Sequence, residues 1–482
     1  MKISFNFLLK TINILFLLLS VYFYYNAGGN DYVNSTTIIL CLFLAIELHL
    51  FLSYANKNNN LLLTILCFDL ILYYSARVFT LLYTEYSVVF LRLNPVTFSD
   101  VNYTLFFIII SNFFFFFGIY IAANSKRKRK SKPTVIIDPF SEKKVIIFLF
   151  ISILLGFPDF IDFGPLTGLM SFIKFYFLNP FNTVLLAMIY FVSHSERMKY
   201  KSKIIFIILF VLQVLGLVFY SSRAAIPTIM LIVLIATLVK NNNKFFLKFS
   251  HLFMTLILIL LSFFLFLFTS FIRPMINEGD ITNRDKITLL QNYNVLENIN
   301  PKKALSPIFD RIGFLDYATE IIAHKPNYSN IITPSYYFKS IVDNVFSPGF
   351  DLFGTPKVAN ALSFRYSNKG ELSFKNLEAS YQSDQLTIYG EFYALFGGWL
   401  SIVFFFFTGY FFQSQIQFGD NYSILISNIY KGLVLFVFIR FIDSFGIDWI
   451  IQNVLTLFFS YWLFKKYIIK KEITLAIKNK IY

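Results

Sequence analysis

The residues of this sequence that could carry chemistry are arginines and carboxylates beside long apolar runs. They are Arg223 in SSRAAIP, Arg273 in FIRPM, Arg311, Asp316, Arg365, Glu391, Arg440, Asp443 and Asp448. A guanidinium group presents a planar fork of donors that matches phosphate oxygens, so several arginines at one membrane surface would suit a lipid diphosphate. Carboxylates beside them could accept or donate protons.

Three of these arginines have two interpretations. Arg223, Arg273 and Arg440 either bind phosphate or are helix-end residues whose long side chains reach the membrane interface. Arg223 favours the first interpretation most, because it occupies a very short turn between two apolar segments, next to two serines. Arg273 comes next, since its Arg-Pro step ends an apolar segment at the start of a long polar one.

The remaining candidates also have structural alternatives. Arg311 and Arg365 are weaker candidates because they lie in the long polar segment, where pairing with acidic neighbours at a solvated surface is the commoner fate. Glu391 is expected just inside an apolar segment, where a carboxylate needs a partner, so a structural pair and a catalytic role both stay open. Asp443 and Asp448 flank the turn DSFGID, for which capping of the turn is the favoured interpretation. Glu391 and Asp316 are the candidate catalytic residues.

Other kinds of site are not indicated. The histidines at positions 49, 194, 251 and 324 are too scattered for a metal-ligand spacing, and both cysteines, Cys41 and Cys67, sit inside apolar runs. The sequence contains neither a glycine-rich phosphate loop nor a nucleophile elbow. We therefore expect no metal, no cofactor and no hydrolysis of ATP.

The composition places these residues in a bilayer. The chain is 57% hydrophobic and only 14% charged, and its mean hydropathy is +0.63, more apolar surface than a water-soluble core can hide. The net charge is +15, and its basic residues are placed along the chain as the orientation of a membrane protein requires. We therefore expect membrane lipids as partners and no nucleic acid.

The expected fold is an all-α polytopic membrane protein. About twelve segments are long and apolar enough to cross the hydrocarbon core: 5–25, 36–54, 61–83, 103–123, 145–163, 176–194, 204–220, 224–239, 251–272, 388–412, 424–442 and 446–464. The run 11–23 resembles a signal peptide but has no small-residue cleavage site, so it is interpreted as the first span. Glycines and prolines interrupt residues 145–178, where a broken or re-entrant helix is an alternative.

Basic residues in the short connections set the orientation. Lys57 and the basic stretches 126–132, 197–203, 240–248 and 465–480 fall on one side, which should be cytoplasmic together with both termini. Three regions follow: an N-terminal bundle of about nine spans at 1–272, a large extracytoplasmic loop of short helices at 273–387, and about three spans with a basic tail at 388–482. The loop is rich in aromatic and aliphatic residues, so we expect it to be folded.

This arrangement resembles the Wzy-type O-antigen and capsule repeat-unit polymerases. The resemblance rests on SSRAA at 221–225, RIGFLDYATEII at 311–322 and YGEFYALFGGWLSIVFFFFTGYF at 389–411. It implies a metal-independent, GT-C-like membrane glycosyltransferase of polysaccharide biosynthesis in the bacterial inner membrane. Such an enzyme would polymerise undecaprenyl-diphosphate-linked oligosaccharide repeats into lipopolysaccharide O-antigen, capsule or exopolysaccharide, and a chain-length regulator protein is a candidate partner.

Two other functions stay open. A lipid-linked oligosaccharide flippase also has about twelve helices, but transporters of that kind usually have short loops and paired helical repeats. An O-antigen ligase shares the architecture of the polymerase, and nothing in the sequence separates the two.

Overall fold

The computed structural model describes most of the chain and contains helices almost throughout the described part. The described residues are 2–82, 95–125, 141–156, 172–173, 175–220, 225–242, 246–248, 313–346, 352–366, 386–420, 424–443 and 446–468. Within them, the only sheet is an antiparallel pair of three-residue strands, β1 (Lys2–Ser4) and β2 (Phe246–Lys248).

Eight helical segments among the described residues are long and apolar enough to cross a membrane. They are Phe5–Asn26, Ser35–Asn58, Leu61–Leu81, Phe98–Asn124, Phe175–His194, Gly398–Gly419, Leu425–Ile442 and Ile447–Tyr467. Large apolar side chains such as Leu18, Phe43 and Phe113 point outward from these segments, where lipid would cover them. The chain therefore has the architecture of a polytopic, all-α membrane protein.

These spans match eight of the twelve predicted segments, and three of the other four segments contain described helices. The helices concerned are α7 (Glu142–Gly156), α10 (Tyr200–Tyr220) and α11 (Ala225–Lys240). Of α11, residues Thr228–Lys240 form an apolar helix shorter than a span. The predicted segment 251–272 lies outside the described residues. A total of twelve spans thus stays a prediction.

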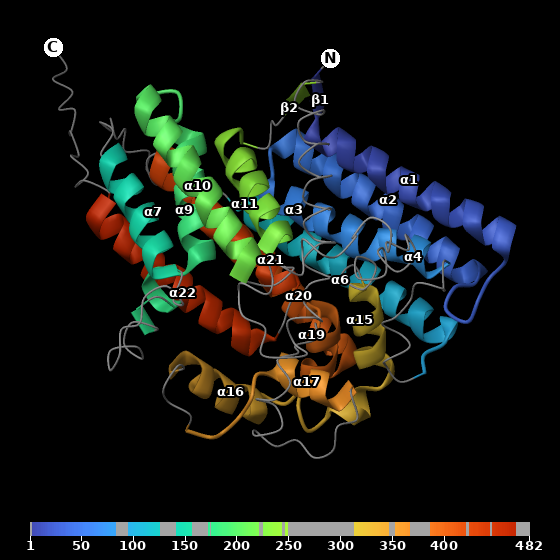
Figure 1. Ribbon diagram of the computed structural model, residues 1–482. Coiled ribbons are helices and arrows are strands. Elements are labelled where there is room, and N and C mark those ends of the chain that lie inside the picture. Colours follow the sequence, from blue (N-terminus) through green and yellow to red (C-terminus); the bar gives the residue numbers. More distant parts are fainter. Residues whose placement is uncertain are drawn as a thin grey trace, which may run out of the picture.

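The bundle is built from helices that pack side by side (Figure 1). Its longer members are α1 (Phe5–Ala27), α2 (Ser35–Asn58), α6 (Phe98–Asn124), α9 (Pro180–His194), α20 (Ser401–Gly419), α21 (Ile424–Ile442) and α22 (Ile447–Ile468). Helices α6 and α20 approach closely at two glycines: a Cβ on Gly118 would lie 2.1 Å from the Phe406 carbonyl oxygen, and one on Gly409 2.2 Å from that of Phe115. Small residues permit this backbone contact in membrane helices, so α20 packs directly against α6.

The third span is the most enclosed of the eight and is not a uniform α-helix. It consists of α3 (Leu61–Leu70), a π-helical turn η1 (Ile71–Ser75) and α4 (Ala76–Leu81). Single π-helical turns inside α-helices are found frequently at functional sites. This turn lies between two ionisable residues of the span, Asp69 and Arg77.

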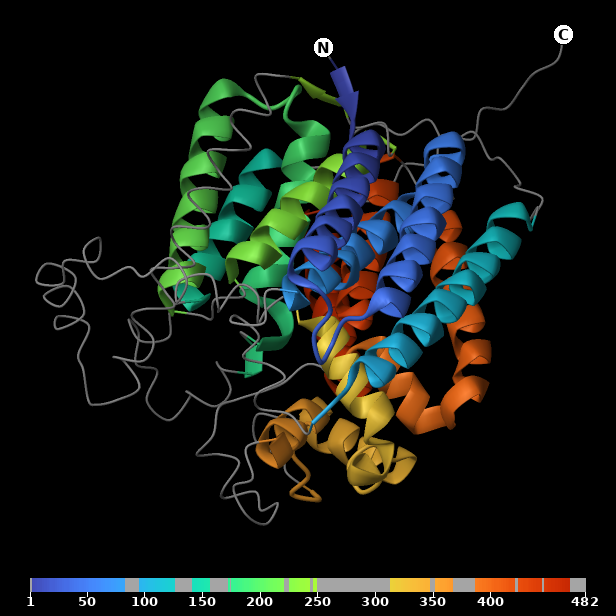
Figure 2. The ribbon, with the colours of Figure 1, turned by 90° about the vertical axis from the view of Figure 1, so that its right-hand side faces the viewer.

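A layer of short helices covers the end of the bundle opposite the start of α1 (Figures 1 and 2). We call this layer the cap; it consists of α15 (Phe314–Ala323), η5 (Lys325–Tyr328), α16 (Pro334–Phe346), α17 (Val358–Tyr366) and α19 (Ile388–Phe396). The cap has a small apolar core of its own, to which Ile321, Tyr328, Tyr337 and Leu362 belong. The described part of the predicted loop is therefore folded into short helices.

The predicted span 388–412 begins later than the sequence suggests. Helix α19 ends at Phe396, and Gly397 and Gly398 follow with φ angles of +86° and +73°. Two consecutive left-handed residues end an α-helix, so a 3-10 turn, η6 (Gly398–Leu400), leads into α20 at a new angle. Glu391 consequently lies in the cap and not inside a span.

Candidate functional site at the boundary between cap and bundle

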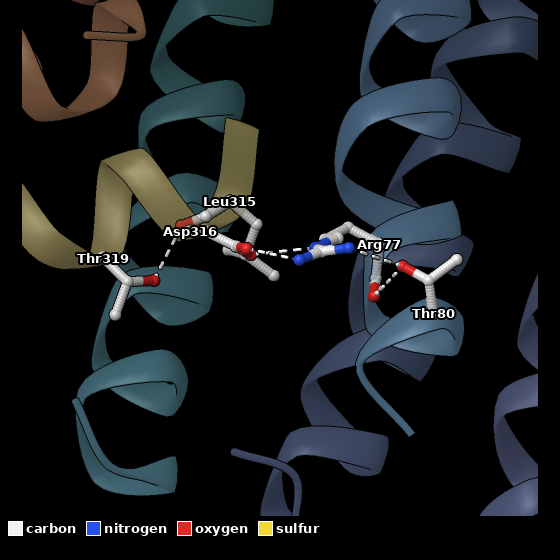
Figure 3. Close-up of polar contacts among 5 residues, drawn as sticks. All are labelled: Arg77, Thr80, Leu315, Asp316 and Thr319. Atoms are coloured by element: carbon white, nitrogen blue, oxygen red, sulfur yellow. Dashed lines mark hydrogen bonds and ion pairs between the residues drawn. The ribbon is translucent and has the colours of Figure 1, made fainter. Parts of the chain in front are cut away.

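Arg77 of α4 and Asp316 of α15 join the bundle to the cap (Figure 3). Arg77 Nε donates a hydrogen bond of 2.9 Å to Asp316 Oδ1, and Nη2 forms an ion pair with Oδ2. The side chains are 1% and 0% exposed. Burial raises the pKa of Asp316, and Arg77 opposes this shift.

Neighbouring contacts hold this pair in place. Arg77 Nη1 donates a hydrogen bond to Thr80 Oγ1 at 3.2 Å. One helical turn before Arg77, the Tyr73 ring stacks on the Phe314 ring, with the ring centroids 3.9 Å apart. Because both Asp316 oxygens meet the same guanidinium group in the interior, the geometry favours a positioning role for Asp316 over direct proton transfer to a substrate.

Glu391 of α19 is also completely buried, with 0% exposure. Its Oε1 accepts a hydrogen bond from the Tyr337 hydroxyl of α16 and a 2.8 Å bond from the Ile447 N–H at the start of α22. Burial, and secondly the Glu391 carboxylate, raise the pKa of Tyr337, so this phenol stays a donor. Glu391 thus connects two cap helices with the last span.

A third set of contacts surrounds Asp448, in the first turn of α22. Asp448 Oδ2 accepts from Ser340 Oγ at 2.5 Å and from the Val358 N–H at 3.0 Å. Lys357 Nζ donates to Gln452 Oε1 at 2.9 Å, and Asp448 is near enough to act on its charge. Burial lowers the pKa of Lys357, and Asp448 opposes this shift.

A pair of carboxyl groups lies where the turn after α21 meets the third span. Asp69 of α3 and Asp443 are within hydrogen-bonding reach of each other. Burial raises the pKa of Asp443 to about 6, while hydrogen bonding to Asp69 and the charge of Arg440 act to lower it. Arg440 Nη2 donates to Thr228 Oγ1 of α11 at 3.1 Å.

Aromatic contacts connect these sets. Tyr74 of η1 and Tyr389 of α19 meet edge to face with ring centroids 5.4 Å apart, and the Tyr389 hydroxyl donates to Asn112 Oδ1 of α6 at 2.5 Å. Asp443 directly follows α21, and Ile447 is the first residue of α22. We call the whole assembly the junction cluster; its ionisable members are Asp69, Arg77, Asp316, Lys357, Glu391, Arg440, Asp443 and Asp448.

The structure brings three of the seven predicted site residues to this boundary, namely Asp316, Glu391 and Arg440. Arg223, Arg273 and Arg311 lie outside the described residues, so their predicted roles stay predictions. Arg365 falls in α17, at a position whose side chain is also outside the described part. Asp443 and Asp448, for which capping was the favoured interpretation, are members of the cluster.

Three members, Asp69, Arg77 and Lys357, were missed by reasoning from the sequence. Asp69 and Arg77 lie within the predicted third span 61–83, and Lys357 lies in the predicted loop. Ionisable residues inside membrane spans are rare and mark functional sites by default, so this position alone was the available signal. Lys431, another ionisable residue within a predicted span, forms an ion pair of 2.5 Å with Asp420, at the far end of α20.

Among the described residues, no group of three or more His, Cys, Asp or Glu side chains is arranged to hold a metal ion. The junction cluster instead combines mostly buried carboxyl groups, among them Asp443 with its pKa raised to about 6, with cations that include the buried Arg77. Such a combination can move a proton and stabilise an anion. No protein-family model, curated protein or solved structure matches this chain.

Proposed function

We propose that this protein polymerises undecaprenyl-diphosphate-linked oligosaccharide repeats at the outer face of the bacterial inner membrane. The observation that carries the proposal is the junction cluster. Its ionisable side chains come from distant parts of the chain and meet where a folded cap covers helices of membrane-spanning length. That is where a lipid-borne diphosphate and its attached sugar would enter together.

The reaction requires two kinds of group at one place. A hydroxyl group at the non-reducing end of the acceptor repeat attacks the anomeric carbon of the donor chain, and the bond from that carbon to the diphosphate oxygen breaks. The hydroxyl proton needs a base, and the leaving diphosphate needs fixed positive charge. Arg440 is the cation of the cluster that lies beside a partly exposed carboxyl group, Asp443. Arg223 and Arg273 are proposed as further phosphate ligands.

The cap would face the extracytoplasmic side. It occupies the end of the bundle opposite the start of α1 (Figure 1), as expected if the N-terminus is cytoplasmic and residues 273–387 are outside. The two positioning pairs, Arg77 with Asp316 and Tyr337 with Glu391, would hold the cap at a constant height above the lipid surface, so that donor and acceptor meet the same groups.

A lipid-linked oligosaccharide flippase is the second candidate, favoured by one observation. Asp69 and Arg77 lie buried within a span, and ionisable groups in that position also mark transport pathways. An O-antigen ligase would use the same chemistry as the polymerase with a different acceptor. The three functions differ in product, which makes a reconstituted assay decisive.

The purified protein is reconstituted in liposomes with lipid-linked repeats, with and without EDTA, and products are separated by length. A ladder of polymers in both conditions supports the proposal. Movement of lipid-linked repeats across the bilayer without a ladder would establish the flippase instead. A product formed only when lipid A core is added would establish the ligase.

Arg440 variants connect the activity to the cluster. Arg440→Ala should abolish the ladder, and Arg440→Lys should shorten it because a lysine keeps the charge but loses the planar fork. Lys240→Ala is the matched control, since Lys240 forms an exposed ion pair with Glu196 and belongs to no part of the cluster. An unchanged ladder in Arg440→Ala would remove this residue from the mechanism.

A further inference from the structure

The carboxyl pair Asp69 and Asp443 has no role in the positioning contacts described above. Asp69 is 2% exposed, and among the described residues its Oδ2 accepts no hydrogen bond from any donor group. Asp443 Oδ1 is likewise a buried oxygen without a donor in that part of the chain. Asp69 and Asp443 are within hydrogen-bonding reach of each other.

Two ionised carboxylates in this position would repel each other and leave both buried oxygens unsatisfied. One proton between them removes both costs, because a protonated carboxyl donates a hydrogen bond that an ionised carboxylate accepts. The two carboxyl groups differ in solvent exposure, because Asp69 is enclosed within the third span whereas Asp443 is partly exposed at the end of α21.

The groups around the pair carry one positive charge, so two ionised carboxylates would leave one negative charge uncompensated. Arg440 from α21 lies near Asp443, and Tyr74 from η1 and Tyr389 from α19 lie near Asp69. Tyr73 of η1 lies near Arg440, and Tyr389 also interacts with Glu47 of α2. The tyrosines are neutral at neutral pH, so Arg440 supplies a single positive charge. One ionised carboxylate therefore balances it, and the second carboxyl is neutral.

We propose that Asp69 and Asp443 share one proton, and that Asp443 is the base that accepts the proton of the acceptor hydroxyl during glycosyl transfer. The second half of this proposal rests on the proposed function. As the new bond from the acceptor oxygen to the anomeric carbon forms, the hydroxyl proton passes to Asp443. The bond from that carbon to the diphosphate breaks, and its electron pair leaves with the diphosphate beside Arg440.

Asp69 is then a positioning residue. It keeps its proton and directs it to Asp443, so that the Asp443 carboxylate presents its remaining lone pairs toward the partly exposed side. After transfer, Asp443 returns the acquired proton to water. The pKa of Asp443, about 6, gives a carboxylate that is ionised at neutral pH yet more basic than an ordinary aspartate, as a general base requires.

The shared proton is tested without any substrate, by infrared spectroscopy of the purified full-length protein at neutral pH. Asp69→Asn should remove the absorption of one protonated carboxyl group, and Asp443→Asn should shift its frequency because the acceptor of the hydrogen bond changes. Spectra of both variants identical to the wild type in this region would overturn the shared proton.

The base is tested by the pH dependence of polymer formation in liposomes. Asp443→Asn should lower the rate about 10²- to 10⁴-fold. Asp69→Leu removes the donor to Asp443 and should move the acidic limb of the profile to higher pH, whereas Asp69→Asn keeps an N–H donor and should leave the limb nearly unchanged. A purely structural Asp69 would change the amount of folded protein but not the position of the limb.

The two proposals fail in different ways. Absence of any polymer from the wild type overturns the proposed function and the role of Asp443 as base, while the infrared spectra still decide the shared proton. Polymer formation by the wild type with full activity in Asp443→Asn overturns the base alone.

Discussion

Arg77 in the third span and Asp316 in the cap form a buried, two-pronged ion pair, in which Nε lies 2.9 Å from Oδ1 and Nη2 contacts Oδ2. A guanidinium group and a carboxylate so enclosed have lost their hydration, and each depends on the other for compensation. The pair therefore sets where the cap sits on the bundle.

Removal of one partner of this pair should destabilise the protein strongly. Arg77→Met or Asp316→Leu alone leaves a buried charge and should cost about 3 to 5 kcal/mol, whereas the double variant should recover most of that loss. Thermal unfolding in detergent measures the difference, with Lys240→Ala as a control because its exposed pair should contribute about 0 to 1 kcal/mol. A stable double variant without polymerising activity would assign this pair of residues to catalysis after all.

Asp443 should make the stability of the protein depend on pH. Its folded-state pKa of about 6 exceeds the ordinary value of 3.8, so between these values the folded protein binds more protons than the unfolded chain. The contribution of Asp443 to the free energy of unfolding is therefore fully present below pH 3.8 and declines as the pH rises toward 6. Asp443→Asn should flatten this decline and be more stable than the wild type at neutral pH, as measured by unfolding at several pH values.

Glu391 is tested by variants that separate charge from hydrogen bonding. Glu391→Gln keeps an oxygen that accepts from Tyr337 and Ile447, so a positioning residue should retain most of the polymer ladder after this change. Tyr337→Phe leaves the Glu391 oxygen short of a donor and should cost about 1 to 3 kcal/mol of stability. Loss of the ladder in Glu391→Gln at normal protein levels would instead support Glu391 as a catalytic residue.

The topology is tested by cysteine labelling from outside the cell. Ser329→Cys in the cap should react, because position 329 is exposed and the cap is expected outside. Ser131→Cys, in the basic segment 126–132, should be spared. Background labelling should be low because both native cysteines, Cys41 and Cys67, are buried. The reverse pattern would overturn the orientation and the placement of the proposed active site.

Arg223 and Arg273 are expected to bind the diphosphate beside Arg440. Loss of either guanidinium group should reduce transition-state stabilisation by about 2.7 to 4 kcal/mol, by analogy with loss of an oxyanion donor. Alanine variants, expressed at matched levels in a null strain, should make single-repeat product without a ladder, and lysine variants a shortened ladder. A residue that only reaches the membrane interface would accept lysine with a normal ladder.

The apolar runs of the amino-acid sequence are sufficient to predict that the chain is helical and belongs in a membrane, and they located eight of the spans. These properties follow from apolar runs of about 20 residues, and such runs act locally, because each helix satisfies its own backbone hydrogen bonds. The hydropathy pattern placed one span boundary wrongly. The apolar run that starts at residue 388 continues through Gly397 and Gly398, but the backbone conformation of these two glycines ends the helix there.

Which ionisable residues meet is visible only in the folded protein. Arg77 and Asp316 lie far apart in sequence, as do Asp69 and Asp443, and no spacing within one segment predicts either pair. Their association depends on how the cap packs on the third span and on where the turn after α21 lies. A buried charge is stable only beside a partner, so the sequence can indicate that Arg77 needs one, but the packing of distant helices determines that it is Asp316.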